Sequence, residues 1–421
     1  MKVTVWGINY APELTGIAPY NAALCEYLQR QGHTVRMVTS FPYYPAWKKQ
    51  PDDAGRLFRT DEGNGVTVHR CWHYVPRRPG TLKRILHEAS FVGSSLLRLL
   101  CLPRADVLVV VSPPLLLGAA AWLLTRVKLA PVVFHVQDMQ PDAALGLGML
   151  KPGRFMRLLY ALEAFAYARA ARVSAISRGM LAAMAGKGVP AEKLIYFPNG
   201  VSLPDARPEP GCFRARHGLR AEDFVAVYSG NLGVKQGLEV LIEAAARVTN
   251  PRLQIVICGD GAMRPQLEDR VRELKLGNVR LLPLQSEPHY LEMLADADLT
   301  LVTQQRGSGA FFFPSKLLRS LALARPVLTV ADEQSELARA LAEGGFGVNV
   351  PPGRAEDLAR ALAELAAAPE RLRAFREAGR RYVAQFEQGR VLRDFAAHLT
   401  ALANRGGVRC GRPKAECEVV G

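Results

Sequence analysis

The chain repeats one pattern, in which short β-branched apolar runs alternate with helical stretches. Val3–Trp6 is the first strand-like run, and Gly32 ends the predicted helix that separates it from the next strand, Val35–Val38. Further strand-like runs are Val107–Val111, Val132–Val136, Val173–Ile176 and Leu194–Phe197. Strands that are apolar throughout and alternate with helices indicate a parallel sheet with helices on both faces.

A second set of alternating elements begins at Phe224. Its predicted strands are Val225–Tyr228, Leu253–Cys258, Val279–Leu282, Leu299–Val302, Val327–Val330 and Val348–Val350. Leu203–Gly211 contains three prolines and is a linker by composition. We therefore predict an α/β fold of two doubly wound, Rossmann-like domains that face a cleft, with ligands at the carboxyl ends of the strands.

The predicted domain boundaries follow from this pattern. The N-terminal domain covers residues 1–203 and the C-terminal domain covers residues 212–385. A further helical stretch covers 386–403, and residues 404–421 form a tail.

The positive charge of the chain is concentrated in its first half. Residues 1–200 contain 24 Lys and Arg against 12 Asp and Glu, whereas the remainder contains 30 against 27. Arg70–Arg104 has seven basic residues, one acid (Glu88) and interleaved apolar residues. Such a segment could lie on an anionic membrane surface or hold a phosphorylated partner, and the alternative is a solvated helix face. Nucleic acid is not an expected partner because no recognised binding motif accompanies the charge.

The start of the chain and its most apolar stretch bear on localisation. Met1 and Lys2 lead straight into a strand, with no recognisable secretory signal. Val107–Thr125 has no charge, but Pro113 and Pro114 interrupt it. A buried strand, a turn and a buried helix are favoured there over a membrane span, so we expect a cytoplasmic protein.

Glycine-rich loops follow several predicted strands. Neither domain has the GxGxxG pattern of dinucleotide dehydrogenases. Instead Gly7–Gly16 follows the first strand, and Tyr228–Gly237, which contains Lys235, opens the second domain. Two further loops follow strands in the same way, and these are Gly259–Gly261 and Gly307–Ser315, the second of which precedes Lys316. Together the loops predict a nucleotide-sized cleft. The predicted donor-binding residues are Gly16, Asn231, Gly233, Gly259, Gly261, Ser315 and Arg319.

The order of these motifs resembles that of the family 4 retaining glycosyltransferases of GT-B fold. The motifs that carry the resemblance are the Gly16 loop, Val133–His135, Pro198–Val201, Ser229–Gly237, Cys258–Gly261, Phe313–Lys316 and Ala324–Val327. Ile8–Tyr20 and His135–Asp142 are similar to the WcaI type of colanic acid biosynthesis glycosyltransferase in particular. The resemblance covers residues 1 to about 400.

The resemblance implies transfer of a sugar, with retention, from a nucleotide sugar to a lipid-linked saccharide of exopolysaccharide (colanic-acid-like) biosynthesis. It implies no required metal or cofactor, and a peripheral position on the inner face of the cytoplasmic membrane. It also implies that the C-terminal domain holds the nucleotide and that the helix 386–403 crosses back to the N-terminal domain. A histidine in the position of His135 is expected near the sugar and the acceptor, and the Gly16 loop near the diphosphate or the acceptor.

Several positions depart from the family pattern. The family's paired glutamates, which contact the donor sugar and the ribose, fall on Phe311 and Arg319, and its usual glycine falls on Ala324. Arg319 is a donor only, so it either contacts the leaving diphosphate or forms a helix salt bridge. Lys235 and Lys316 are then expected to supply the charge for the phosphates.

The transfer chemistry gives these residues roles. Departure of the diphosphate develops negative charge, which Lys235 and Lys316 would stabilise, while His135 would tolerate the positive anomeric carbon. Asp138 and Asn199 are candidates for the acceptor or sugar site, with helix capping as the alternative for Asp138. The alternatives for the lysines and His135 are solvated side chains and a core histidine.

Two other functions fit the same architecture. A sugar-nucleotide 2-epimerase shares the fold, but the loops offer few of the carboxylates that its acid–base chemistry needs. The loss of both glutamates also fits an inactive nucleotide-binding subunit of a membrane glycosylation assembly.

Overall fold

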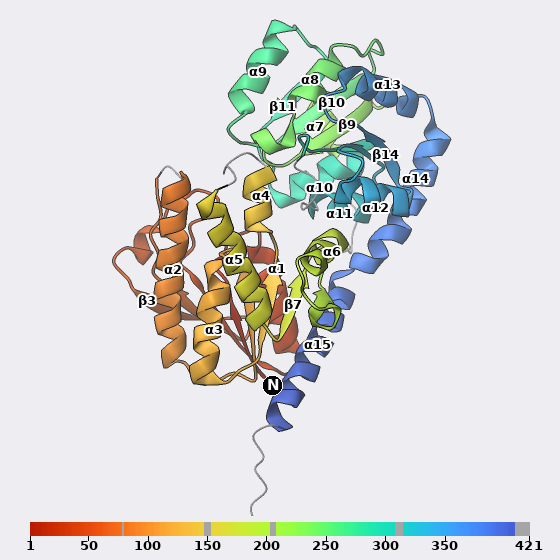
Figure 1. Ribbon diagram of the computed structural model, residues 1–421. Helices are drawn as coiled ribbons and strands as arrows, with labels where there is room; N and C mark the ends of the chain where they lie inside the picture. The colour runs from red at the N-terminus through yellow and green to blue at the C-terminus, as the bar shows by residue number, and fades with distance from the viewer. Residues whose placement is uncertain (78–79, 147–152, 203–207, 308–314, 409–421) are drawn as a thin grey trace, which may run out of the picture. The chain divides into compact units, whose positions relative to one another are not determined.

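The computed structural model describes residues 1–77, 80–146, 153–202, 208–307 and 315–408. The chain forms two compact units, each built on one sheet (Figure 1). Unit 1 comprises residues 1–141, 151–198 and 391–421, and unit 2 comprises residues 142–150 and 199–390. Phe311 and residues 203–207 of the predicted linker lie outside the described residues.

Unit 1 contains an eight-stranded sheet in the order β3-β4-β2-β1-β5-β6-β7-β8, with β3 alone antiparallel to its neighbour. The strands are β1 Lys2–Trp6, β2 Thr34–Ser40, β3 Phe58–Gly63, β4 Val66–Cys71, β5 Val107–Ser112, β6 Val132–Val136, β7 Arg172–Ala175 and β8 Leu194–Tyr196. The six predicted strands are confirmed, whereas the β3–β4 hairpin was not predicted. The order reverses beside β1, which makes the ends of β1 and β5 a topological switch point.

The helices of unit 1 connect these parallel strands. They are α1 Ala18–Arg30, α2 Thr81–Cys101, α3 Leu116–Lys128, α5 Arg154–Arg169 and α6 Arg178–Gly186, with short 3₁₀ turns Pro51–Asp53 and Ala191–Lys193; α4 is Gln140–Gly146. The uncharged stretch Val107–Thr125 is a buried strand, a Ser-Pro-Pro turn and a helix, as predicted. The C-terminal helix α15, Gln388–Val408, continues five residues past the predicted end and packs on the unit 1 core. There the rings of Phe395 and Phe197 stack with 3.8 Å between their centres.

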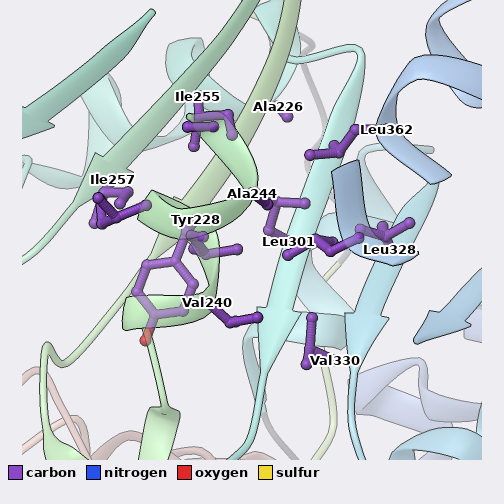
Figure 2. Close-up of a cluster of buried hydrophobic side chains, with 14 of the residues drawn as sticks. Ala226, Tyr228, Val240, Ala244, Ile255, Ile257, Leu301, Leu328, Val330 and Leu362 are labelled. Carbon is purple, nitrogen blue, oxygen red and sulfur yellow. The ribbon is translucent and has the colours of Figure 1, made fainter. Parts of the chain in front are cut away.

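Unit 2 contains a fully parallel six-stranded sheet in the order β11-β10-β9-β12-β13-β14. Its strands, all predicted, are β9 Phe224–Ser229, β10 Leu253–Cys258, β11 Val279–Leu282, β12 Leu299–Thr303, β13 Val327–Val330 and β14 Gly347–Val350. Its helices are α7 Cys212–Arg216, α8 Glu239–Ala245, α9 Arg264–Glu273, α10 Glu287–Asp296, α11 Ser315–Ala322, α12 Glu336–Gly344, α13 Ala355–Ala366 and α14 Pro369–Val383, with 3₁₀ turns Val234–Gln236 and Ala384–Phe386. Figure 2 shows side chains of β9, β10, β12 and β13 packed against α8 and α13.

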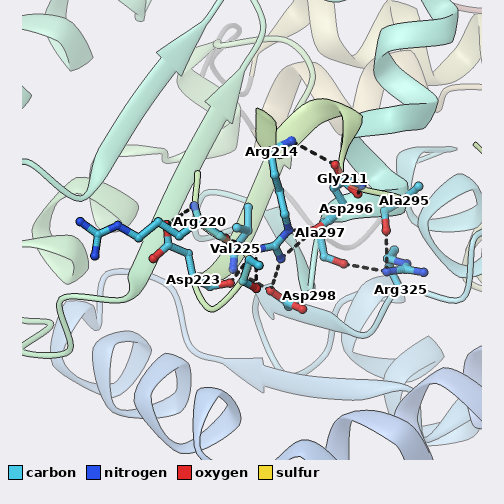
Figure 3. Close-up of polar contacts among 11 residues, drawn as sticks. Gly211, Arg214, Arg220, Asp223, Val225, Ala295, Asp296, Ala297, Asp298 and Arg325 are labelled. Carbon is cyan, nitrogen blue, oxygen red and sulfur yellow. Dashed lines mark hydrogen bonds and ion pairs between the residues drawn. The ribbon is translucent and has the colours of Figure 1, made fainter. Parts of the chain in front are cut away.

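Two aspartates at the junction of α10 and β12 hold the helix α7 in place (Figure 3). The Asp296 carboxylate accepts hydrogen bonds from the backbone N–H groups of Gly211, Phe213 and Arg214. The Asp298 carboxylate pairs with the Arg214 guanidinium at 2.8 Å. These bonds satisfy the N–H groups at the start of α7, which has no cap of its own.

Ala324 occupies a backbone conformation that favours glycine. Its φ is +55°, between the end of α11 and Arg325, whose guanidinium donates to the carbonyls of Ala295 and Ala297. The left-handed conformation explains why the related family has glycine at this position, since a Cβ is disfavoured there.

We predict that Ala324→Gly stabilises unit 2 by about 1 kcal/mol, because it relieves the left-handed alanine. Ala361→Gly, in the middle of α13, is the control and should destabilise by about 1 kcal/mol. Urea denaturation of both variants checks the prediction, and an Ala324→Gly variant that unfolds at lower urea than the parent would contradict it.

Candidate functional site

The predicted glycine loop of unit 2 follows β9 and is hydrogen-bonded to the loop that follows β10. The backbone N–H groups of Gly230 and Leu232 donate to the carbonyls of Cys258 and Asp260 at 2.9 and 2.8 Å. A Cβ on Gly259 would lie 1.8 Å from the Gly230 carbonyl oxygen, and one on Gly261 would lie 2.5 Å from that of Leu232. These two glycines therefore allow the loops to pack together, whether or not a ligand approaches them.

Lys316 extends from the first turn of α11 to this loop. Its Nζ donates to the Tyr228 hydroxyl at 2.9 Å and lies 4.0 Å from the centre of the tyrosine ring. The hydroxyl in turn donates to the Asn231 carbonyl at 2.8 Å. Lys316 is thus held against the glycine loop by a tyrosine that belongs to the core of the unit (Figure 2).

Burial and the positive charge of Lys235 lower the pKa of Lys316 to about 7. The two lysines stand 81 positions apart in the chain and lie within electrostatic reach of each other in the structure. Their role in phosphate binding stays a prediction. Among the described residues, the ammonium group of Lys316 has Tyr228 as its hydrogen-bond partner and forms no ion pair with a carboxylate. Two cations that repel each other favour a shared anion between them.

A hollow adjoins the glycine loop at the carboxyl ends of β12, β13 and β14. Its volume is about 370 Å³, within the range of small-molecule sites. The residues that line it are Gly237, Glu239, Val240, Gln304, Gln305, Arg306, Val330, Pro352 and Gly353. The polar ones were not predicted, although Gln304–Arg306 directly follow a predicted strand, and that position could have indicated them.

The other predicted donor residues have separate environments. Asn231 is exposed, and its side-chain nitrogen lies 2.8 Å from the position of a Cβ on Gly233. Arg319 forms an ion pair with Glu287 of α10 at 2.8 Å, the second of the two alternatives for this residue. Ser315 begins α11, and its side chain lies outside the described residues.

In unit 1, hydrogen bonds to Glu13 join the Gly16 loop to the loop that follows β2. The Glu13 carboxylate accepts hydrogen bonds from the backbone N–H groups of Tyr43 and Tyr44 at 2.9 and 2.8 Å and from the Asn9 amide at 2.8 Å. Burial raises the pKa of Glu13. Glu13 was not predicted as a site residue, and its contacts hold the Gly16 loop at the carboxyl edge of the sheet.

His135 lies at the end of β6 and is buried in the unit 1 core. Its Nδ1 lies 3.0 Å from the Ser174 hydroxyl, and its Nε2 lies 3.0 Å from the Gln137 amide nitrogen. Burial lowers the pKa of His135 to about 3, so the ring is neutral. Both ring nitrogens are used inside the protein, as in a core histidine, and a catalytic role for His135 stays a prediction.

A carboxylate that was not predicted lies close to Asp138. The Glu88 carboxylate accepts a hydrogen bond from the Gln140 amide at 3.1 Å, and Gln140 accepts one from the backbone of Leu115 at 2.7 Å. Burial and the nearby negative charge of Asp138 raise the pKa of Glu88 to about 7. Gln140 thereby links α2 to the loops after β5 and β6, at the switch point of the sheet. Asn199, the other candidate for the acceptor or sugar site, belongs to unit 2 and follows β8 in the chain.

No set of three or more His, Cys, Asp or Glu side chains among the described residues is arranged to hold a metal ion. The expectation that the reaction needs no metal or other cofactor stays a prediction.

Comparison with known proteins identifies the family. Residues 15–200 match the model of the glycosyl transferase 4-like domain, and residues 212–382 match that of the glycosyl transferases group 1. The chain is 36% identical over 406 residues to WcaI of Escherichia coli strain K12, which is named for colanic acid biosynthesis as a glycosyl transferase; the match covers 94% of this chain and 98% of WcaI. The chain belongs to the WcaI-type glycosyltransferases.

Solved structures agree with this fold. Sucrose-phosphate synthase of Thermosynechococcus elongatus matches the glycosyltransferase with a TM-score of 0.76 at 18% identity, over 96% of this chain and 99% of that one. HepE of Anabaena, solved in complex with UDP-glucose, matches with a TM-score of 0.69 at 15% identity, over 95% and 100%. The predicted GT-B fold and glycosyltransferase class are therefore confirmed, and the class disfavours the epimerase alternative.

Proposed function

We propose that this glycosyltransferase moves a sugar, with retention, from a nucleotide sugar to a lipid-linked saccharide in the synthesis of a colanic-acid-like exopolysaccharide. The process is the one for which WcaI is named, and the donor class is supported by the UDP-glucose complex of HepE. The enzyme would work at the inner face of the cytoplasmic membrane, where a lipid-linked acceptor is held.

The observation that carries the donor site is the pair of lysines beside the glycine loop. A nucleotide diphosphate brings two adjacent negative charges, and Lys316 and Lys235 supply two positive ones within electrostatic reach of each other. During transfer the bond between the anomeric carbon and the phosphate oxygen breaks, and its electron pair leaves with the diphosphate. Fixed cations stabilise that charge without a metal ion.

The acceptor is proposed to bind unit 1 at Glu88. A carboxylate that is held by Gln140 and oriented at the switch point can accept a hydrogen bond from a sugar hydroxyl. This role requires the ionised carboxylate, because a protonated carboxyl group loses acceptor capacity. Asp138, whose charge acts on Glu88, belongs to the same subsite.

Lys316→Ala is expected to weaken binding of the donor's nucleoside diphosphate at least tenfold, about 1.4 kcal/mol. Titration calorimetry with UDP, GDP and dTDP measures this and also identifies the base. Arg373→Ala, on the exposed face of α14, is the matched control and should bind like the parent. If Lys316→Ala and the parent bind the preferred nucleotide equally, the proposed donor site is wrong.

Glu88→Gln is expected to lower the transfer rate without changing nucleotide affinity. In the parent, the rate should fall as the pH drops below about 7, because Glu88 becomes protonated, and the variant should lose this acid limb. Glu62→Gln, at an exposed position of β3, is the control. An unchanged acid limb in Glu88→Gln would remove Glu88 from the acceptor site.

A further inference from the structure

Three helices of unit 1 expose an unusual amount of apolar surface. α2, α3 and α5 lie side by side over one face of the sheet (Figure 1). Among the described residues, nine of the eighteen exposed large hydrophobic side chains belong to these three helices, and they are Leu82, Ile85, Leu86, Leu97, Leu100, Leu123, Val127, Phe155 and Leu158. A patch of this kind on a globular protein marks an interaction surface.

The longest of the three, α2, is apolar on its outer side. Its inward face buries His87, Phe91, Ser95 and Leu99, two of which are polar. Its outward face carries exposed residues at spacings of three and four, and these are Leu82, Leu86, Ala89, Gly93, Leu97 and Leu100. A surface helix of a soluble globular protein usually has the opposite arrangement, with apolar residues inward and charged residues outward.

The charges on these helices have one sign at the surface. Their basic residues are Lys83, Arg84, Arg98, Arg126, Lys128, Arg154, Arg157 and Arg169. Their only two carboxylates are both engaged inside the unit. Glu163 is buried and forms an ion pair with Lys187 at 2.6 Å. Glu88 is half-buried and accepts a hydrogen bond from Gln140.

An aromatic cluster joins α3 to α5 on this surface. Trp122 and Phe165 meet edge to face, with 5.3 Å between ring centres. The guanidinium groups of Arg126 and Arg169 lie 5.5 and 5.7 Å from the Trp122 ring. Tryptophan flanked by arginines is typical of groups that sit at the level of lipid headgroups.

We propose that the outward face of α2, α3 and α5, here named the lipid face, docks flat on an anionic bilayer. Anionic headgroups complement its cations, and the interfacial layer accepts its leucines. A second copy of the chain fits less well, because it would bring two cationic faces together. Within the described residues no helix is long and apolar enough to span a bilayer, so binding would be interfacial.

The lipid face is not the same as the Arg70–Arg104 segment, which the sequence indicated as a possible membrane-binding region. Arg70, at the start of the predicted Arg70–Arg104 region, is buried and pairs with Asp61 at 2.7 Å. α3 and α5, which supply five of the eight cations, lie outside that region. The proposal rests on the proposed function only in that a lipid-linked acceptor gives the enzyme a reason to be at the membrane.

Co-sedimentation of the full chain with vesicles tests the lipid face without any nucleotide. Vesicles of phosphatidylcholine with about one-third phosphatidylglycerol should bind the protein, pure phosphatidylcholine should bind it at least about tenfold more weakly, and added salt should reduce the binding. Equal binding to both vesicles, or none to either, would overturn the proposal.

Leu97→Glu should weaken vesicle binding at least about fivefold, and Arg126→Gln about fivefold. Leu284→Glu changes a leucine of unit 2 with nearly the same exposure, 61% against 62%, and should bind as the parent does. If the parent is a dimer in sedimentation that Leu97→Glu dissociates, the face is a self-association surface instead. Nucleotide binding by Leu97→Glu should be unchanged, so failure of the lipid face is distinguishable from failure of the donor site.

Discussion

The ammonium group of Lys316 is the constraint around which unit 2 is arranged. A half-buried cation without a carboxylate partner costs free energy, so the protein must hold it in place through other interactions. Tyr228 does this with its hydroxyl and its ring, and Tyr228 is itself fixed in the core at the end of β9. The same hydroxyl bonds to Asn231, which sets the start of the glycine loop. The position of the charge and the shape of the loop therefore depend on one side chain.

Most of the fold could be predicted because buried parallel strands are apolar throughout. The β3–β4 hairpin was not predicted. β3 is mostly charged and polar, as in Arg59, Asp61 and Glu62, and the buried strand β4 mixes valines with polar residues. A signal was nevertheless present. Asn64 and Gly65 have positive φ values of 51° and 75°, and the Asn-Gly pair is a strong hairpin-turn signal.

The candidate site was predicted in part. The lysines and glycine loops could be found because they stand next to predicted strands, and the sheet order then brings strand ends together. The partners of Lys316 and Arg319 could not be found, because Tyr228 and Glu287 are distant in sequence. In the sequence Glu88 stands out only as the single acid of a basic segment, because its hydrogen bond to Gln140 depends on the packing of α2 beside the sheet. The glycines at 259 and 261 have a packing role that a motif cannot distinguish from ligand contact.

The most direct test of this account is the proton balance of nucleotide binding. Titration calorimetry of the preferred nucleoside diphosphate at about pH 8, in two buffers of different ionisation enthalpy, counts the protons taken up. With a pKa of about 7, Lys316 is mostly neutral at that pH, and adjacent phosphate oxygens should raise its pKa. The account predicts uptake of nearly one proton per site, and affinity that falls as the pH rises above 7. Identical binding enthalpies in the two buffers would contradict it, because the diphosphate would then not meet this lysine.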